Sequence, residues 1–120
     1  MTGIRSIGQE WLIDASGCDA ALLKDPARLS GLFEELIITL KLNVVGTPQW
    51  HVFPLPGGVT GLALLSESHL AIHTFPEHRY AALSIYSCKP SEPLDFLSLL
   101  KRHLGAAGVT LRAVPREAKP

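Results

Sequence analysis

The 120-residue sequence has few cysteines, no long apolar run and no net charge, and each of these excludes a class of protein. Its two cysteines, Cys18 and Cys88, form no Cys-x-x-Cys pair, which argues against a disulfide framework or a zinc ribbon. The sequence contains no run of about 18 apolar residues and no signal-peptide core, so we expect a cytoplasmic protein that does not bind a membrane. Basic and acidic residues number 11 each, so nothing electrostatic indicates a nucleic-acid partner.

Apolar residues, in contrast, are abundant. The hydrophobic fraction is 47% and the mean hydropathy +0.22, which is high for a chain that we interpret as one domain, residues 1–120. An apolar excess of this kind indicates that part of the surface is buried against another subunit. We therefore expect an oligomer.

The spacing of apolar residues predicts an α+β domain. Asp25 and Pro26 are typical of a helix start, and Gly105 is typical of a helix end. We expect helices over 26–40 and 91–104, strands over 9–15, 43–53, 59–66, 69–75, 80–88 and 109–114, and a frayed tail over 115–120. This order predicts a two-layer α/β sandwich with a mostly antiparallel sheet and two helices on one face. The other face is a candidate for a dimer contact or a buried site.

Serine and histidine are concentrated in the segment LLSESHLAIHTFPEH, residues 64–78. A metal site on His69, His73 and His78 is disfavoured, because four residues of extended chain span about 13 Å. No cysteine or carboxylate stands at a matching spacing, so we expect no metal. Ser66 and Ser68 lack the G-x-S-x-G elbow of a serine hydrolase.

An intramolecular acyl shift fits the segment better. The Ser68 hydroxyl can attack the carbonyl of Glu67, which converts their peptide bond into an ester. If a base then removes the α-proton of the serine, the ester is eliminated and the chain breaks. The new N-terminus hydrolyses to a pyruvoyl group.

Residues 64–88, LLSESHLAIHTFPEHRYAALSIYSC, resemble the proenzyme segment of bacterial and archaeal S-adenosylmethionine decarboxylases. Upstream, GVTG at 58–61 is similar to the G-V-S-G of that family, and the first residues fit its opening motif, with Glu10 in place of a histidine. The opening motif is matched by Gly8, Asp14, Cys18 and Asp19. The resemblance implies a homodimer of two-layer α/β sandwiches with its sites at the subunit interface.

The resemblance also implies a role for each matching residue. Ser68 would become the pyruvoyl group and Glu67 would end the released β chain, so the chain would divide into 1–67 and 68–120. His73 would assist the cleavage by proton transfer, Thr60 would supply a hydroxyl, and Cys88 would donate a proton during turnover. The pyruvoyl carbonyl condenses with the amine of an amino-acid-type substrate and accepts the electron pair left by carbon dioxide. Neither a metal nor pyridoxal phosphate is then needed.

The positions expected to contact the substrate depart in part from the pattern of this family. The resemblance makes Phe53 a candidate for stacking on adenine and Glu77 a candidate substrate contact. Ser84 stands where the family has aspartate, while Arg79 and Lys89 stand where it has glycine. Because Ser84 has the parity of Cys88, we expect that a carboxylate has been lost from or near the site and that two cations have been gained nearby. We expect S-adenosylmethionine decarboxylation for spermidine synthesis; the alternatives are L-ornithine or L-arginine, or a noncatalytic paralogue.

Strand parity predicts how these side chains face. One side of 80–88 carries Tyr80, Ala82, Ser84, Tyr86 and Cys88, while Leu83 and Ile85 face the helices. Ser68 and His73 differ by an odd number, so a straight strand directs them to opposite faces. A bend, a bulge or the chain end left by cleavage must bring them together. Cys18 is expected to be a buried, unreactive thiol.

Overall fold

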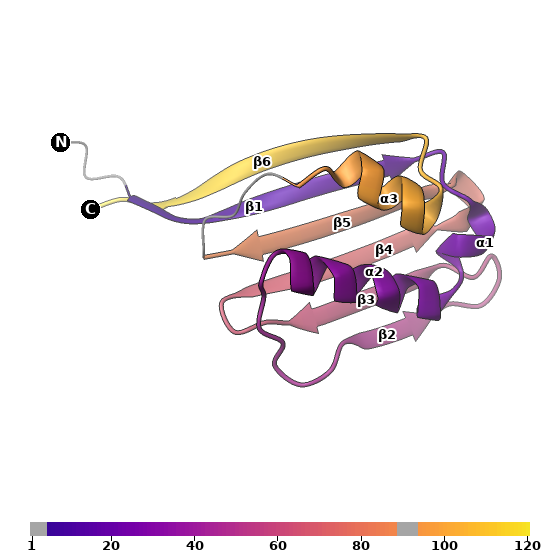
Figure 1. The fold of residues 1–120 in the computed structure, drawn as a ribbon, viewed down its shortest axis with the longest axis horizontal. Helices are drawn as coiled ribbons and strands as arrows, with labels where there is room; N and C mark the ends of the chain where they lie inside the picture. Colours follow the sequence, from indigo (N-terminus) through magenta and orange to yellow (C-terminus); the bar gives the residue numbers. More distant parts are fainter. Residues whose placement is uncertain (1–4, 89–93) are drawn as a thin grey trace.

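The computed structural model describes residues 5–88 and 94–120 (Figure 1). Its elements, in chain order, are β1 (Arg5–Ser16), α1 (Ala20–Leu23), α2 (Pro26–Thr39), β2 (Gln49–Val52), β3 (Val59–Leu64), β4 (Ser68–Phe75), the 3-10 turn η1 (Pro76–His78), β5 (Tyr80–Ser87), α3 (Phe96–Leu104) and β6 (Gly108–Ala118).

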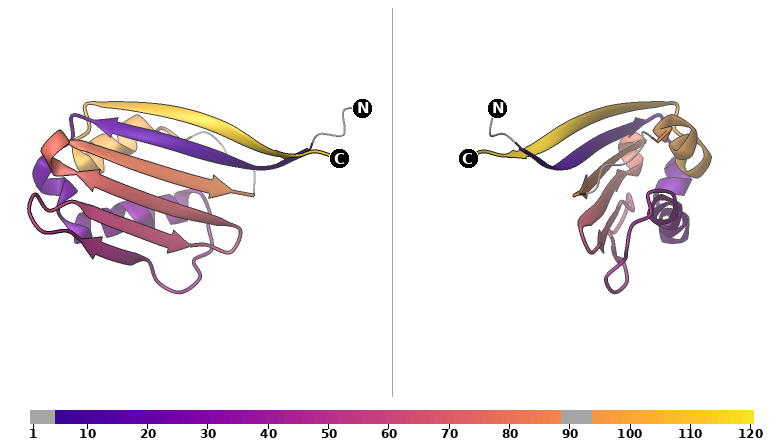
Figure 2. Two further views of the ribbon diagram at one scale, coloured as in Figure 1. Left: turned by 180° about the vertical axis from the view of Figure 1, so that it is seen from behind. Right: turned by 60° about the vertical axis from the view of Figure 1, so that its left-hand side comes forward.

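The strands form one sheet in the order β2-β3-β4-β5-β1-β6, and every neighbouring pair is antiparallel. The helices cover one face and leave the other face of the sheet open (Figure 2). The predicted two-layer sandwich is confirmed. No helix in residues 5–88 and 94–120 is long and apolar enough to cross a membrane.

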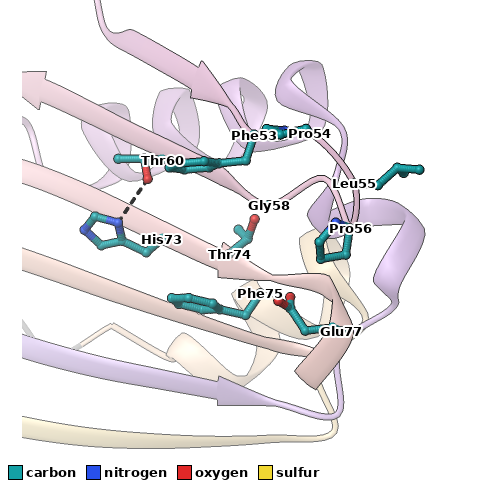
Figure 3. A pocket seen from close by; sticks show the side chains of 10 residues that line it. All are labelled: Phe53, Pro54, Leu55, Pro56, Gly58, Thr60, His73, Thr74, Phe75 and Glu77. Atoms are coloured by element: carbon teal, nitrogen blue, oxygen red, sulfur yellow. Dashed lines mark hydrogen bonds between the residues drawn. The ribbon is translucent and has the colours of Figure 1, made fainter.

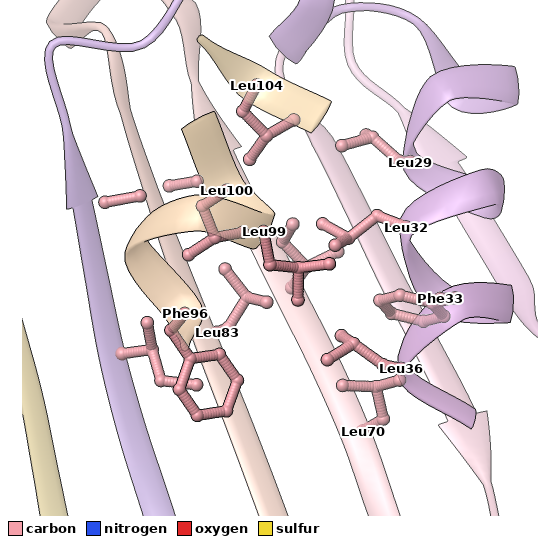
Figure 4. Packing of buried hydrophobic residues seen from close by; sticks show 14 of the residues in the cluster. Leu29, Leu32, Phe33, Leu36, Leu70, Leu83, Phe96, Leu99, Leu100 and Leu104 are labelled. Carbon is pink, nitrogen blue, oxygen red and sulfur yellow. The ribbon is translucent and has the colours of Figure 1, made fainter. Parts of the chain in front are cut away.

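Alternation along the strands builds the core. Leu70 and Ile72 of β4 and Leu83 and Ile85 of β5 are buried under the helices. The helices meet them with apolar side chains at helical spacing (Figure 4). These side chains are Leu29, Leu32, Phe33 and Leu36 of α2 and Phe96, Leu99, Leu100 and Leu104 of α3. Burial of each such side chain stabilises the fold by about 1.5–3 kcal/mol.

The helix ends follow the predicted signals. The Asp25 carboxylate accepts a hydrogen bond from the Ala27 N–H at 3.0 Å, so it caps α2. Gly105 has a φ of 67° and ends α3, a conformation in which other residues are strained. Asp95 caps α3 through the Ser98 N–H at 3.1 Å, so the helix begins at Phe96. The predicted start at residue 91 falls within 89–93, outside the described residues, and 94–95 are not helical.

Three other boundaries were wrong. Residues 115–118 continue β6 instead of fraying, because Pro115 pairs with Gln9 in an edge strand, where a missing N–H is tolerated. The strand expected from residue 43 begins only at Gln49, and Val44 makes an isolated bridge to Leu65. Residues 20–23, which belong to none of the predicted elements, form the short helix α1, which Asp19 caps.

Candidate active site

The predicted scissile bond lies in a tight turn between β3 and β4. The Leu65 N–H donates to the Ser68 carbonyl at 3.1 Å and closes this turn, Leu65–Ser68, which we call the cleavage turn. The Glu67 carbonyl accepts a hydrogen bond from the Cys88 backbone N–H at 3.1 Å. A donor therefore already faces the oxygen on which negative charge would develop if Ser68 attacked this carbonyl.

The Cys88 side chain lies on the open face beside Tyr86. The exposed Cys88 thiol donates a hydrogen bond to the Tyr86 hydroxyl oxygen, which lies 3.9 Å from the sulfur. This hydrogen bond, together with desolvation, raises the pKa of Tyr86. The Tyr86 ring stacks on His69 with centroids 5.8 Å apart. A Cβ at Gly8 would lie 2.5 Å from the Tyr86 hydroxyl oxygen, so glycine leaves the room that this tyrosine occupies.

A pocket of about 430 Å³ lies at the other end of β4 (Figure 3). Phe53, Thr60, His73 and Glu77, all predicted site residues, line it. Thr60 and His73 are directly opposite each other on β3 and β4, and the Thr60 Oγ1 and His73 Nδ1 atoms are 3.2 Å apart. The pocket therefore combines an aromatic ring, a hydroxyl–imidazole pair and a carboxylate.

The pocket floor is held by Thr74, a residue that the sequence reasoning did not identify. Its buried hydroxyl accepts from the Val59 N–H at 2.9 Å and donates to the Leu23 carbonyl at 2.8 Å. One hydroxyl thus ties β4 to β3 and to α1. A Cβ at Gly58 would lie 2.6 Å from the Thr74 carbonyl oxygen, so the chain packs closely here.

The cleavage turn and the pocket are far apart within one chain. β4 pairs with β3 and β5 without a register shift, so neither a bulge nor a bend brings Ser68 to His73. Five residues of strand separate them, which corresponds to about 16 Å. Ser68 has the parity of the buried Leu70, whereas His73 is exposed on the open face. The predicted bend or bulge is therefore absent from this strand, and Ser68 and His73 of one chain stay apart.

Comparison with known proteins gives the family. A family model for S-adenosylmethionine decarboxylase matches residues 9–117. The chain belongs to this family. It is 36% identical over 115 residues to an S-adenosylmethionine decarboxylase proenzyme of Prochlorococcus marinus, covering 92% of this chain and 88% of the relative. A Saccharolobus solfataricus proenzyme is 33% identical over 103 residues, covering 85% and 81%.

A solved relative has the same fold. The adenosylmethionine decarboxylase of Aquifex aeolicus superposes with a TM-score of 0.79 at 26% identity, covering 93% of this chain and 92% of that one. The resemblance drawn from residues 64–88 is therefore confirmed at the level of family and fold.

The positions that depart from the family pattern are spread over the sheet. Ser84 lies on the open face, opposite Leu12 of β1 and Ala71 of β4. Arg79 precedes β5, at the end remote from Cys88, and its Nε donates to the Cys18 carbonyl at 2.7 Å. Arg79 therefore adds no charge beside Cys88. Lys89 lies outside the described residues.

Cys18 is fully buried, as predicted, and burial raises the pKa of its thiol. No three His, Cys, Asp or Glu side chains within 5–88 and 94–120 gather closely enough to hold a metal ion.

Besides Thr74, two contributors to this site were missed. Phe75 lines the pocket and stacks on Tyr80 at 5.8 Å; its parity with His73 in TFPEH was the available signal. The Cys88 N–H has no signal in the sequence, because its position depends on how β4 and β5 pair.

Proposed function

We propose that this chain is a self-processing, pyruvoyl-dependent decarboxylase that acts on S-adenosylmethionine and so provides the aminopropyl donor for spermidine synthesis. One observation carries the proposal: in a member of this family, the Glu67 carbonyl before Ser68 accepts a hydrogen bond from the Cys88 N–H. A serine that follows a polarised carbonyl is what an N-to-O acyl shift requires.

In the self-cleavage, the Ser68 oxygen bonds to the Glu67 carbonyl carbon and the carbon–nitrogen bond breaks. The Cys88 N–H stabilises the oxyanion that forms in between. Removal of the Ser68 α-proton then expels the Glu67 carboxylate as the C-terminus of 1–67. The remaining enamine end takes up water and releases ammonia, which leaves a pyruvoyl group on 68–120.

The residues of this chain suit that group. Its carbonyl would condense with a substrate amine and accept the electron pair left by carbon dioxide. The exposed Cys88 thiol, which follows β5 beside the cleavage turn, would return a proton to the substrate carbon. In the pocket, the Phe53 ring offers a face for stacking and the Glu77 carboxylate offers hydrogen-bond acceptors.

We further propose that the active unit is a homodimer joined through the open sheet faces. His73 and Ser68 of one chain are separated by about 16 Å of strand, which is too far for proton transfer. A second copy facing the sheet would bring its Thr60 and His73 over the cleavage turn of the first. The open face carries exposed apolar side chains that such pairing would bury, including Leu62 and Leu64 at 48% and 60% exposure.

Intact-mass analysis of the purified protein tests the self-cleavage. Cleavage before Ser68 predicts a 67-residue fragment and a 53-residue fragment, 120 − 67, whose N-terminus carries pyruvoyl instead of serine. A Ser68→Ala variant, the matched control, stays at full mass. A wild-type chain that remains uncut after long incubation would favour the noncatalytic paralogue instead.

Ser84 favours one second candidate, the same chemistry on L-ornithine or L-arginine. Its hydroxyl replaces the family aspartate on the open face, so a contact to the substrate has changed. Carbon dioxide release should be compared among S-adenosylmethionine, L-ornithine and L-arginine for the wild-type protein and for Ser84→Asp. Faster release from either amino acid, lost in Ser84→Asp, would select the second candidate.

A further inference from the structure

The cleavage turn is held from outside by residues Asn43–Val45, which we call the brace. The Ser66 N–H donates to the Asn43 carbonyl at 2.8 Å, and the Val45 N–H donates to the Leu64 carbonyl at 2.9 Å. Between these two hydrogen bonds, Val44 pairs with Leu65 as an isolated antiparallel bridge. In Figure 1 the connection from α2 to β2 passes beside the turn between β3 and β4.

The helix layer fixes the position of the brace. Lys41, just after α2, has a φ of 55° and turns the chain toward the sheet. The Leu42 N–H then donates to the Ile37 carbonyl at 2.9 Å, and both side chains pack against the core. The brace therefore connects the end of α2 to the turn that carries the predicted scissile bond.

Together these bonds hold the Glu67 carbonyl from three sides. Ser68 is held in β4 by its pairing with Ser87, and the Glu67 oxygen is held by the Cys88 N–H. On the N-terminal side of Glu67, the neighbouring residue Ser66 is held by its hydrogen bond to the Asn43 carbonyl of the brace. A misplacement of about 1 Å at a reacting centre lowers a rate by about a hundredfold, so this third restraint bears on the acyl shift.

We propose that the brace is a positioning element for self-cleavage. It holds the cleavage turn so that the Ser68 oxygen meets the Glu67 carbonyl carbon while the carbonyl oxygen stays on the Cys88 N–H. In that step the carbon–oxygen bond forms, the carbon–nitrogen bond breaks, and the hydroxyl proton ends on the freed amine. The brace contributes geometry and no reacting group. The inference rests on the proposed self-cleavage.

The test removes one hydrogen bond of the brace. Val45→Pro deletes the N–H that binds the Leu64 carbonyl, and the half-exposed Val45 side chain leaves room for the ring. Val45→Ala keeps that N–H, and Val44→Pro removes an N–H that takes part in neither bond of the brace. Freshly synthesised chains are followed by denaturing gel and mass as they convert to the two fragments.

We expect Val45→Pro to slow the conversion by about tenfold or more, the change that one lost hydrogen bond can produce. The two controls should stay within about threefold of wild type. Hydroxylamine identifies the step, because it cuts an ester but not a peptide bond and leaves Ser68 as a free N-terminus. If the brace acts on ester formation, hydroxylamine will not restore rapid cutting of Val45→Pro.

Three results would overturn the inference: cutting of Val45→Pro at the wild-type rate, equal slowing in Val44→Pro, or rapid cutting of Val45→Pro by hydroxylamine. If Val45→Pro lacks the wild-type circular dichroism spectrum, the cutting rates without hydroxylamine are compared for a chain with α-hydroxyvaline at position 45, in which an ester oxygen replaces the N–H. Failure of the wild-type chain to cut would instead count against the proposed function itself.

Discussion

Subunit exchange gives a sharp test of the two-chain site. A Ser68→Ala chain keeps Thr60 and His73, whereas a His73→Ala chain keeps Ser68 and Cys88. If each site takes its cleavage turn from one chain and its histidine from the other, neither variant cuts itself in a pure dimer. In a mixed dimer, the Ser68→Ala chain supplies the histidine that its companion lacks.

The size of the effect follows from geometry and counting. Proton transfer needs the heavy atoms within about 2.6–3.2 Å, whereas the strand places His73 about 16 Å from Ser68 of its own chain. Loss of the base should therefore slow cutting by about a hundredfold to ten-thousandfold in pure His73→Ala. Pure Ser68→Ala lacks the attacking hydroxyl and should not cut. Random pairing of equal amounts puts about half of the His73→Ala chains in mixed dimers, so about half of them should be cut.

The assay mixes the unfolded variants, one carrying a mass tag, refolds them together and measures each by intact mass. The control replaces the Ser68→Ala chain with a Ser68→Ala/His73→Ala chain, which pairs equally well but brings no histidine. Cutting should then disappear. If the first mixture yields no cut His73→Ala chain although wild type refolds and cuts, the two-chain site is wrong.

Two further predictions concern stability. Gly8→Ala would place its Cβ 2.5 Å from the Tyr86 hydroxyl oxygen, so we expect its free energy of unfolding, measured with denaturant, to fall by about 1–3 kcal/mol. Gly31 lies in α2 with nothing within 4 Å of the added atom, so Gly31→Ala should raise the free energy of unfolding by up to about 1 kcal/mol. The opposite order of the two variants would refute this reasoning. Hydrogen bonds from Arg102, then His103, lower the pKa of Glu35 from 4.5 to about 2. Because the folded-state pKa is the lower one, this stabilisation is complete above pH 4.5 and is lost as the pH falls toward 2. The unfolding free energies of wild type and Glu35→Gln should therefore converge over that interval, and a gap of constant size would contradict the assignment.

The parts of the fold that the sequence predicts are those governed by local rules. Alternation along 80–88 correctly separated Leu83 and Ile85 from Ser84 and Tyr86, because successive strand residues face opposite ways. The Asp25 cap and the Gly105 helix end were also predicted correctly, because each depends on only a few neighbouring residues.

The missed features depend on residues far apart in the chain. A frayed tail is expected from Pro115, but this residue lies at the sheet edge, which is known only from its pairing with β1, and β6 continues through it. The Thr60–His73 contact requires the register between β3 and β4. The Cys88 N–H and the Asn43 carbonyl are backbone groups, so residue type carries no information about what they bind.

The strand order has a consequence for the proposed self-cleavage. β1 belongs to 1–67 yet lies between β5 and β6, which both belong to 68–120. Because strands of both fragments alternate in the sheet, a cut before Ser68 would release neither fragment from the other. Unfolding a nicked molecule, however, releases two separate polypeptides, and recovery becomes a bimolecular reaction that dilution slows. The uncut chain can refold by itself, whereas the persistence of the cut protein would depend mainly on its rate of unfolding.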